Sequence, residues 1–154
     1  MEKRNTARAL ENLDIAIDLY KEMDLQNTSY LYCLINKSKT LLDMGRTEEA
    51  GQCSNEAVML ADRISSPEGR FETELLDCLV RSFIDKEESV RSLLSMMSPD
   101  LRREQTAEIY YTLYRIDRID ECRKSALQIY RSLYSETGKH QYRLKIDELE
   151  KSSS

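Results

Sequence analysis

The sequence has very few of the residues that end helices or form tight turns. It contains four glycines, two prolines and no tryptophan among 154 residues. A β-sheet needs many turns, and turns depend largely on Gly, Pro, Asn and Asp. Leu, Glu, Arg and Lys are abundant instead, and these residues favour helices. The composition therefore predicts an all-α protein with essentially no strand.

Long apolar runs are also missing from the sequence. No run approaches the roughly 18 apolar residues of a membrane-spanning helix. The N-terminus lacks the apolar core of a signal peptide. We therefore expect a soluble, cytoplasmic protein without a membrane partner.

An excess of basic charge is missing too. The chain has 23 Lys and Arg against 28 Asp and Glu, which gives a net charge of -5. Nucleic-acid binding needs a basic surface that displaces counterions, so we expect no nucleic-acid binding by this domain. The stretch from Asp43 to Asp77 holds nine carboxylates and three arginines. This stretch predicts a solvated face or, alternatively, a docking surface for a basic partner.

The four cysteines, Cys33, Cys53, Cys78 and Cys122, are scattered singly and form no C-x-x-C pair. We interpret them as small buried hydrophobic residues with reduced thiols. Reduced thiols agree with the cytosol, although a periplasmic or extracellular domain that has lost its signal peptide is an alternative.

Motifs for catalysis or for cofactor binding are not recognisable. His140 is the single histidine, and no cysteine or carboxylate accompanies it at ligand spacing on one helix face. The sequence has no glycine-rich phosphate loop and no nucleophile elbow. We therefore expect His140 to be a solvated surface residue, and we expect a noncatalytic protein without metal or cofactor.

Apolar residues recur at three- and four-residue intervals along most of the chain. In the first segment this stripe comprises Ala9, Leu13, Ala16, Ile17 and Tyr20. The pattern predicts eight helices, over residues 6–23, 28–44, 47–64, 66–84, 86–97, 99–116, 117–137 and 139–151.

Several of these predicted helices have recognisable start signals. Ser66-Pro67 and Ser98-Pro99 each place a capping hydroxyl before a proline at the first helical position. Asp85 stands three residues before a glutamate, as in a capping box. Asn27 or Thr28 is expected to cap the helix over 28–44.

Residues 30–61 have the features of one complete antiparallel helix pair. Gly45 lies where the first helix must end, because glycine adopts a positive φ without strain. Thr47 to Glu49 supply a cap and an acidic first turn for the second helix. Ala50 and Ala57 lie two turns apart on that helix, and their small side chains allow a close helix contact.

This stretch resembles a tetratricopeptide repeat, with the family's A-x6-A pattern after a G-x-x-x-E-A turn. The family's packing positions in the first helix fall on Leu34, Ser38 and Leu41. The resemblance implies a right-handed α-solenoid of about seven or eight antiparallel helices, forming a single domain over 1–154. The alternative is an up-and-down helical bundle. The implied units are a partial repeat at 6–23, the best-matching repeat at 28–64, a degenerate repeat at 66–97, a repeat at 99–137 and a capping or linking helix at 139–151.

In this family the first helix of each pair lines a concave face that binds peptides. The positions implied for this chain are Tyr32, Asn36, Lys39 and Asp43, then Glu74, Cys78 and Arg81, and then Glu108, Tyr111 and Arg115. Asn36 and Lys39 lie one helical turn apart and could donate to a peptide backbone or terminal carboxylate. This pair resembles part of the family's carboxylate clamp, but Glu74 and Glu108 occupy places where the clamp has donors.

The leading functional hypothesis is therefore a noncatalytic scaffold that binds a protein or peptide on its concave face. The alternative is a ligand-sensing or regulatory domain excised from a larger bacterial signalling or transcription regulator. A third possibility is a homo-oligomer that stacks through the first helix, where Leu10, Ile15 and Ile17 would not all be covered within one chain.

Overall fold

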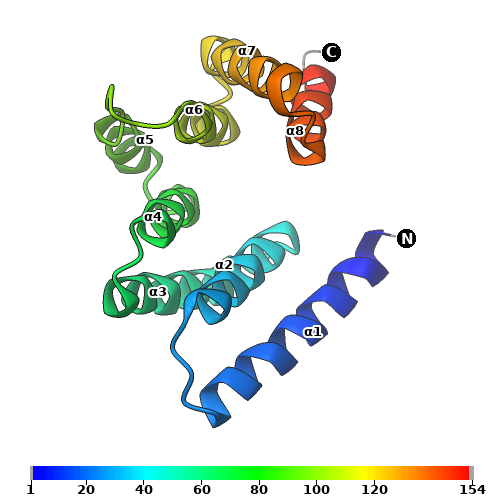
Figure 1. Ribbon diagram of the computed structural model, residues 1–154, viewed down its shortest axis with the longest axis vertical. Helices are drawn as coiled ribbons and strands as arrows, with labels where there is room; N and C mark the ends of the chain where they lie inside the picture. The colour runs from blue at the N-terminus through cyan, green and yellow to red at the C-terminus, as the bar shows by residue number, and fades with distance from the viewer. Residues whose placement is uncertain (1, 153–154) are drawn as a thin grey trace. The chain divides into compact units, whose positions relative to one another are not determined.

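The computed structural model describes residues 2–152, and this part of the chain is helical apart from short connections (Figure 1). It contains eight helices and no strand within that range, which confirms the all-α prediction. The helices are α1 (Glu2–Glu22), α2 (Thr28–Asp43), α3 (Thr47–Ile64), α4 (Pro67–Arg81), α5 (Lys86–Ser95), α6 (Arg103–Asp117), α7 (Asp120–Thr137) and α8 (His140–Lys151).

Three helices begin at the predicted capping side chains. Asn27 Oδ1, Ser66 Oγ and Asp85 Oδ1 each accept a hydrogen bond from the backbone N–H three residues later, at 2.9, 3.1 and 3.0 Å. Each bond satisfies a backbone donor that has no partner inside the helix. The predicted starts of α2, α4 and α5 are thereby confirmed.

The predicted glycine stop at Gly45 is also confirmed, and a second glycine ends α7. Gly45 has φ 75° after α2, and Gly138 has φ 64° after α7. At these angles a residue with a Cβ atom is strained, so glycine ends both helices at little cost.

Two other start signals are wrong. Residues 98–101 form a turn, in which the backbone N–H of Leu101 donates to the Ser98 carbonyl at 3.2 Å, so Pro99 does not open a helix. The helix begins at Arg103 instead. Thr47 is not the cap of α3 either, because Arg46 occupies that position and its guanidinium binds Glu49.

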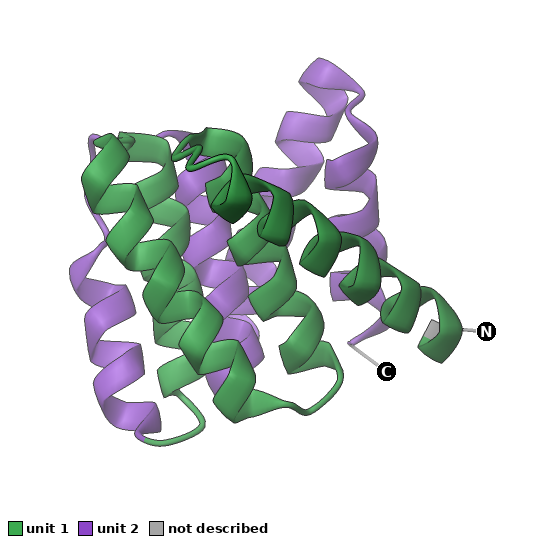
Figure 2. Ribbon diagram, turned by 90° about the horizontal axis from the view of Figure 1, so that it is seen from below, with its two compact units in different colours: residues 1–84 green, residues 85–154 purple. Residues whose placement is uncertain are grey.

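The helices group into two compact units, residues 1–84 with α1 to α4 and residues 85–154 with α5 to α8 (Figure 2). The division falls inside the repeat that was predicted at 66–97. In unit 1, α2 packs against α1, α3 and α4. The main core cluster of unit 1 comprises Ile17, Leu31, Leu34, Ile35, Ala57, Leu60, Ala61, Leu76 and Val80.

The contact between α2 and α3 depends on small residues. Ala50 and Ala57 are completely buried, as predicted. Ser38 is also completely buried, and its hydroxyl donates to the Ala50 carbonyl at 2.8 Å. In α1, Ile17 is buried as predicted, but Ala9 is exposed because the packed face of this helix runs through Leu10 instead.

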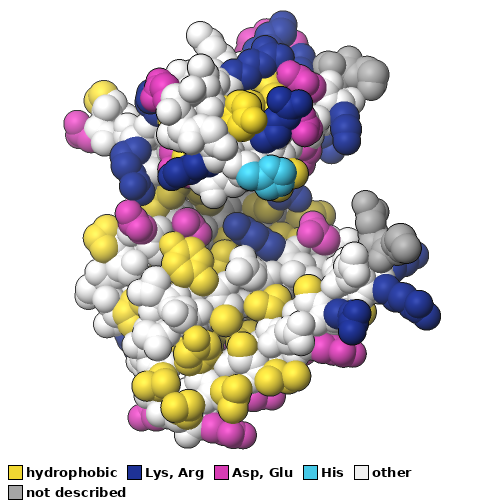
Figure 3. Space-filling view, turned by 45° about the vertical axis from the view of Figure 1, so that its right-hand side comes forward, with side chains coloured by type: hydrophobic (Ala, Val, Ile, Leu, Met, Phe, Trp, Pro, Cys, Tyr) yellow, Lys and Arg dark blue, Asp and Glu magenta, His cyan; other side chains and the backbone are white. Residues whose placement is uncertain are grey.

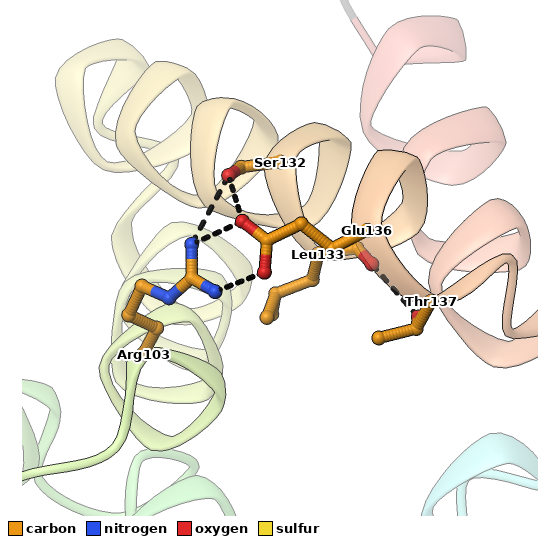
Figure 4. Close-up of polar contacts among 5 residues, drawn as sticks. All are labelled: Arg103, Ser132, Leu133, Glu136 and Thr137. Atoms are coloured by element: carbon orange, nitrogen blue, oxygen red, sulfur yellow. Dashed lines mark hydrogen bonds and ion pairs between the residues drawn. The ribbon is translucent and has the colours of Figure 1, made fainter.

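In unit 2, α6 packs on α7, α7 packs on α8, and α5 contacts α6. Figure 4 shows one of the polar contacts between α6 and α7, in which the Arg103 guanidinium donates to Glu136 and to Ser132 at 2.9 and 3.1 Å. These side chains are exposed, so solvent screens the ion pair and it adds little to stability. The buried core cluster comprises Ala107, Tyr111, Tyr114, Ala126, Leu127, Tyr130, Leu133, Tyr142, Ile146 and Leu149.

Gly69 provides a test of the packing between α2 and α4. A Cβ atom added at Gly69 would lie 2.5 Å from Leu31 Cδ2, whereas one added at Gly51 would lie 3.6 Å from Val80 Cγ1. We expect Gly69→Ala to lower the free energy of unfolding by about 1–3 kcal/mol through overpacking. Gly51→Ala is the matched control, and it should raise the free energy of unfolding by about 0.5–1 kcal/mol through helix propensity. Urea unfolding followed by circular dichroism measures both, and equal effects would contradict the proposed close approach.

Candidate functional site

The predicted α2 residues form a row on one side of the helix. Asn36, Lys39 and Asp43 are exposed, and Tyr32 is half-buried. The opposite side of α2 is buried, with Leu34 and Ile35 at 2% and 0% exposure. The packing of α2 therefore fixes the direction in which the polar row faces.

Carboxylates from α4 lie near the N-terminal end of this row. The Tyr32 hydroxyl donates to Glu72 Oε1 at 3.3 Å. Burial raises the pKa of Tyr32, and the negative charges of Glu72 and Glu68 raise it further. The N-terminal end of the row is thus acidic, Lys39 further along α2 is basic, and Asp43 at the C-terminal end is acidic again.

The structure does not bring the three α4 residues together as a binding surface. Cys78 is buried, as predicted for the four cysteines, so it does not line a surface as the projection of this helix implied. Arg81 is exposed, but its Nε donates to Asp77 Oδ2 on the same helix at 2.7 Å. Glu74 is exposed beside a shallow hollow, whose lining is Ser65, Pro67, Arg70, Phe71 and Glu74.

Two of the three α6 residues are occupied by contacts inside unit 2. Tyr111 is buried, and its hydroxyl donates to Glu148 Oε1 of α8 at 2.6 Å. Glu108 Oε1 accepts from the Tyr130 hydroxyl of α7 at 2.8 Å. The predicted exposure of Tyr111 is therefore wrong, because α8 supplies a partner on that side of α6. Arg115 is exposed, with its guanidinium carbon 5.8 Å from the centre of the Tyr111 ring.

A pocket that the sequence did not predict lies in unit 1, between the C-terminal ends of α1 and α3 and the N-terminal end of α2. It has a volume of about 190 Å³. Its lining comprises Tyr20, Lys21, Asp24, Leu25, Gln26, Tyr30, Leu34, Glu56, Met59, Leu60 and Arg63.

The pocket has an apolar floor and a charged rim. Leu34 and Leu60 are buried beneath it, whereas Met59 and Leu25 are 53% and 40% exposed. The rings of Tyr20 and Tyr30 stack, with their centroids 5.5 Å apart. The Lys21 ammonium lies 3.7 Å from a Glu56 carboxylate oxygen, so α1 and α3 are joined at the rim. Burial is the main cause that raises the pKa of Tyr30, and the cations Lys21 and Arg63 oppose this shift.

The connection between α1 and α2 explains why the sequence did not reveal this pocket. Asp24 has φ 51°, and the backbone N–H of Leu25 returns to the Tyr20 carbonyl at 3.0 Å. This turn brings Leu25 beside the pocket and lets Tyr20 meet Tyr30. Helical periodicity assigns Tyr20 to an inward stripe but does not predict the shape of the turn.

The four cysteines are free thiols. Cys53 and Cys78 are buried, and Cys33 and Cys122 are half-buried, so burial raises the pKa of all four thiols.

His140 is exposed, as predicted. Within residues 2–152, no three His, Cys, Asp or Glu side chains gather as metal ligands would. No helix in that range is both long and apolar enough to cross a membrane.

Buried tyrosine in unit 2 makes the free energy of unfolding depend on pH in the alkaline range. Burial, with the charge of Glu108, raises the pKa of Tyr130 far above its value in the unfolded chain, which is about 10. Above pH 10 the unfolded state loses this proton while the folded state keeps it, so the free energy of unfolding falls as pH rises.

Between pH 9 and pH 11 the free energy of unfolding should fall by about 1.4 kcal/mol less in Tyr130→Phe than in the parent, because the variant has no proton to lose at this position. Urea unfolding at the two pH values measures the difference. Tyr134→Phe is the control, since Tyr134 is half-buried at the edge of the same core. A pH dependence unchanged by Tyr130→Phe would contradict the assignment of this loss of stability to the Tyr130 hydroxyl.

Comparisons with protein-family models, with curated protein sequences and with solved structures found no match to this chain. The likeness to tetratricopeptide repeats therefore rests on the residues of 30–61.

Proposed function

We propose that this chain is a noncatalytic protein-binding module, and that the pocket beside Tyr20 and Tyr30 receives an apolar side chain of a partner peptide or protein. The supporting observation is the combination of an apolar floor with exposed Met59 and Leu25 and a charged rim. Protein interfaces have the same plan, with a desolvated anchor at the centre and polar groups around it.

The size of the pocket favours a side chain over a free small molecule. Its volume of about 190 Å³ lies below the roughly 300–1,000 Å³ of common small-molecule sites. A space of this size accommodates one large apolar residue. The rest of the binding area must then come from the surface around the pocket.

The walls of the pocket are held by the core of unit 1. Leu34 and Leu60 belong to that core and are 2% and 3% exposed. The Tyr20 and Tyr30 rings are stacked on each other. Little side-chain entropy is then lost from these groups when a partner binds, which favours affinity.

The polar α2 row is proposed as a second, weaker contact. Asn36 and Lys39 could donate to the backbone of a bound peptide, and Glu72 beside Tyr32 favours a basic residue at the other end. Exposed charges steer association and set orientation more than they add affinity. In this proposal the eight helices form the tetratricopeptide-like solenoid implied by residues 30–61.

Selection from a library of random peptides displayed on phage tests the pocket, with dissociation constants measured by fluorescence anisotropy. We expect selected peptides to share an apolar anchor, and Met59→Glu to weaken their binding at least about tenfold. Leu144→Glu is the matched control, because Leu144 is 57% exposed on α8, close to the 53% of Met59. Equal binding by the parent and by Met59→Glu would rule out the pocket as the site.

Lys39→Glu tests the α2 row separately. We expect the same peptides to bind about threefold more weakly, with a loss that shrinks as salt concentration rises, because exposed charges are screened. Lys139→Glu has the same change in charge on an exposed side chain of unit 2 and should have no effect. A loss that is independent of salt would contradict an electrostatic role for Lys39.

A further inference from the structure

Helix α1 has a second apolar face that no part of unit 1 covers. Leu10 and Ile17 are 9% and 4% exposed and belong to the core, so two of the three residues considered for stacking are covered within the chain. Ile15, Leu19 and Met23 are 60%, 52% and 65% exposed. They follow one another at intervals of four residues, which places them along one side of the helix.

The uncovered face has the spacing of a coiled-coil seam. The exposed residues Arg8, Asn12, Ile15, Leu19 and Glu22 are separated by steps of four, three, four and three. This alternation keeps side chains on the line along which two helices can pack over several turns. The seam is apolar in the middle and charged at its two ends.

The charges at the two ends have opposite sign. Lys3, Arg4 and Arg8 are basic and lie in the first two turns of α1. Asp18 and Glu22 are acidic and lie in its last two turns, where the basic Lys21 is paired with Glu56 of α3. Figure 3 shows hydrophobic side chains gathered on the visible face of unit 1, with basic side chains near the N-terminal end of α1. A helix with this arrangement complements a copy of itself that runs in the opposite direction.

We infer that two copies of this chain associate through their α1 helices, packed antiparallel about a two-fold axis. Ile15 then packs against Ile15 of the second copy at the two-fold axis, with Leu19 one turn away on either side, in the register that also places Arg8 opposite Glu22. Arg8 lies within reach of Glu22 of the second copy at each end of the seam. A parallel arrangement would instead place Arg8 beside Arg8 and Glu22 beside Glu22, and both contacts are repulsive.

The size of the seam implies weak association. A helix of 21 residues is about 31 Å long, and one helix face buries less than the ~800 Å² per partner of a standard interface. We therefore expect a reversible dimer with a dissociation constant in the range of about 10–100 µM.

Sedimentation velocity of the whole chain from about 1 µM to about 300 µM tests the dimer. The parent should pass from monomer to dimer across this range. Leu19→Glu should leave a monomer with unchanged helicity by circular dichroism, because Leu19 is half exposed and its loss removes no core contact. Leu144→Glu is the control on an equally exposed leucine of α8 and should dimerise like the parent. A parent that stays monomeric throughout, or a Leu144→Glu variant that is also monomeric, would overturn the inference.

Charge reversal tests the antiparallel direction. Arg8→Glu should raise the dissociation constant about threefold to tenfold, because both symmetric pairs become repulsive. Adding Glu22→Arg in the same chain should restore the parent value to within about twofold, since each pair is then attractive again. An Arg8→Glu variant that dimerises like the parent would indicate a parallel pair, in which like charges meet at position 8 before and after the change, and would overturn the inference.

The seam residues Ile15 and Leu19 do not line the proposed peptide pocket, although Tyr20 and Lys21 of the same helix do. Met59→Glu should dimerise like the parent, and Leu19→Glu should still bind selected peptides. Failure of one proposal is therefore distinguishable from failure of the other.

Discussion

The burial of α2 is the constraint on which unit 1 depends. Leu31 and Ile35 on this helix are completely buried, and α2 contacts α1, α3 and α4. Small groups on α3 allow the close approach, and the buried hydroxyl of Ser38 is satisfied by the Ala50 carbonyl. Because three sides of α2 are committed to packing, the remaining side carries the polar row, and the helix ends around Tyr30 frame the pocket.

In unit 2 the space between the helices is filled largely by aromatic residues. Tyr111 and Tyr130 fill space between helices that aliphatic side chains fill in unit 1, and each brings a hydroxyl that must be paired when it is buried. Glu148 and Glu108 accept those hydrogen bonds. Glu108 is therefore already hydrogen-bonded within unit 2. In unit 1, by contrast, Asn36 and Lys39 are exposed and face solvent.

Much of the helical structure could be predicted, because local signals determine where helices begin and end. Asn27, Ser66 and Asp85 cap helices through their own side chains, and Gly45 and Gly138 end them. Prediction failed where contacts between helices, and not the local sequence, determine the backbone conformation or the burial of a side chain. The capping hydroxyl of Ser98 instead accepts from the Asp100 N–H within a turn, and a projection of α6 by itself cannot show that α8 covers Tyr111. The pocket depends on the turn at Asp24, which periodicity does not describe.

The distribution of the thiols has a consequence for the dynamics of the chain. Cys33, Cys53 and Cys78 lie in unit 1, and Cys122 lies in unit 2. A thiol whose pKa is raised by burial reacts slowly while its helix stays packed, because the thiolate is the nucleophile. Alkylation then proceeds mainly through transient local unfolding. Since each unit carries its own natural probe, the rates at which these cysteines become labelled report the opening of each unit separately in the unmodified protein.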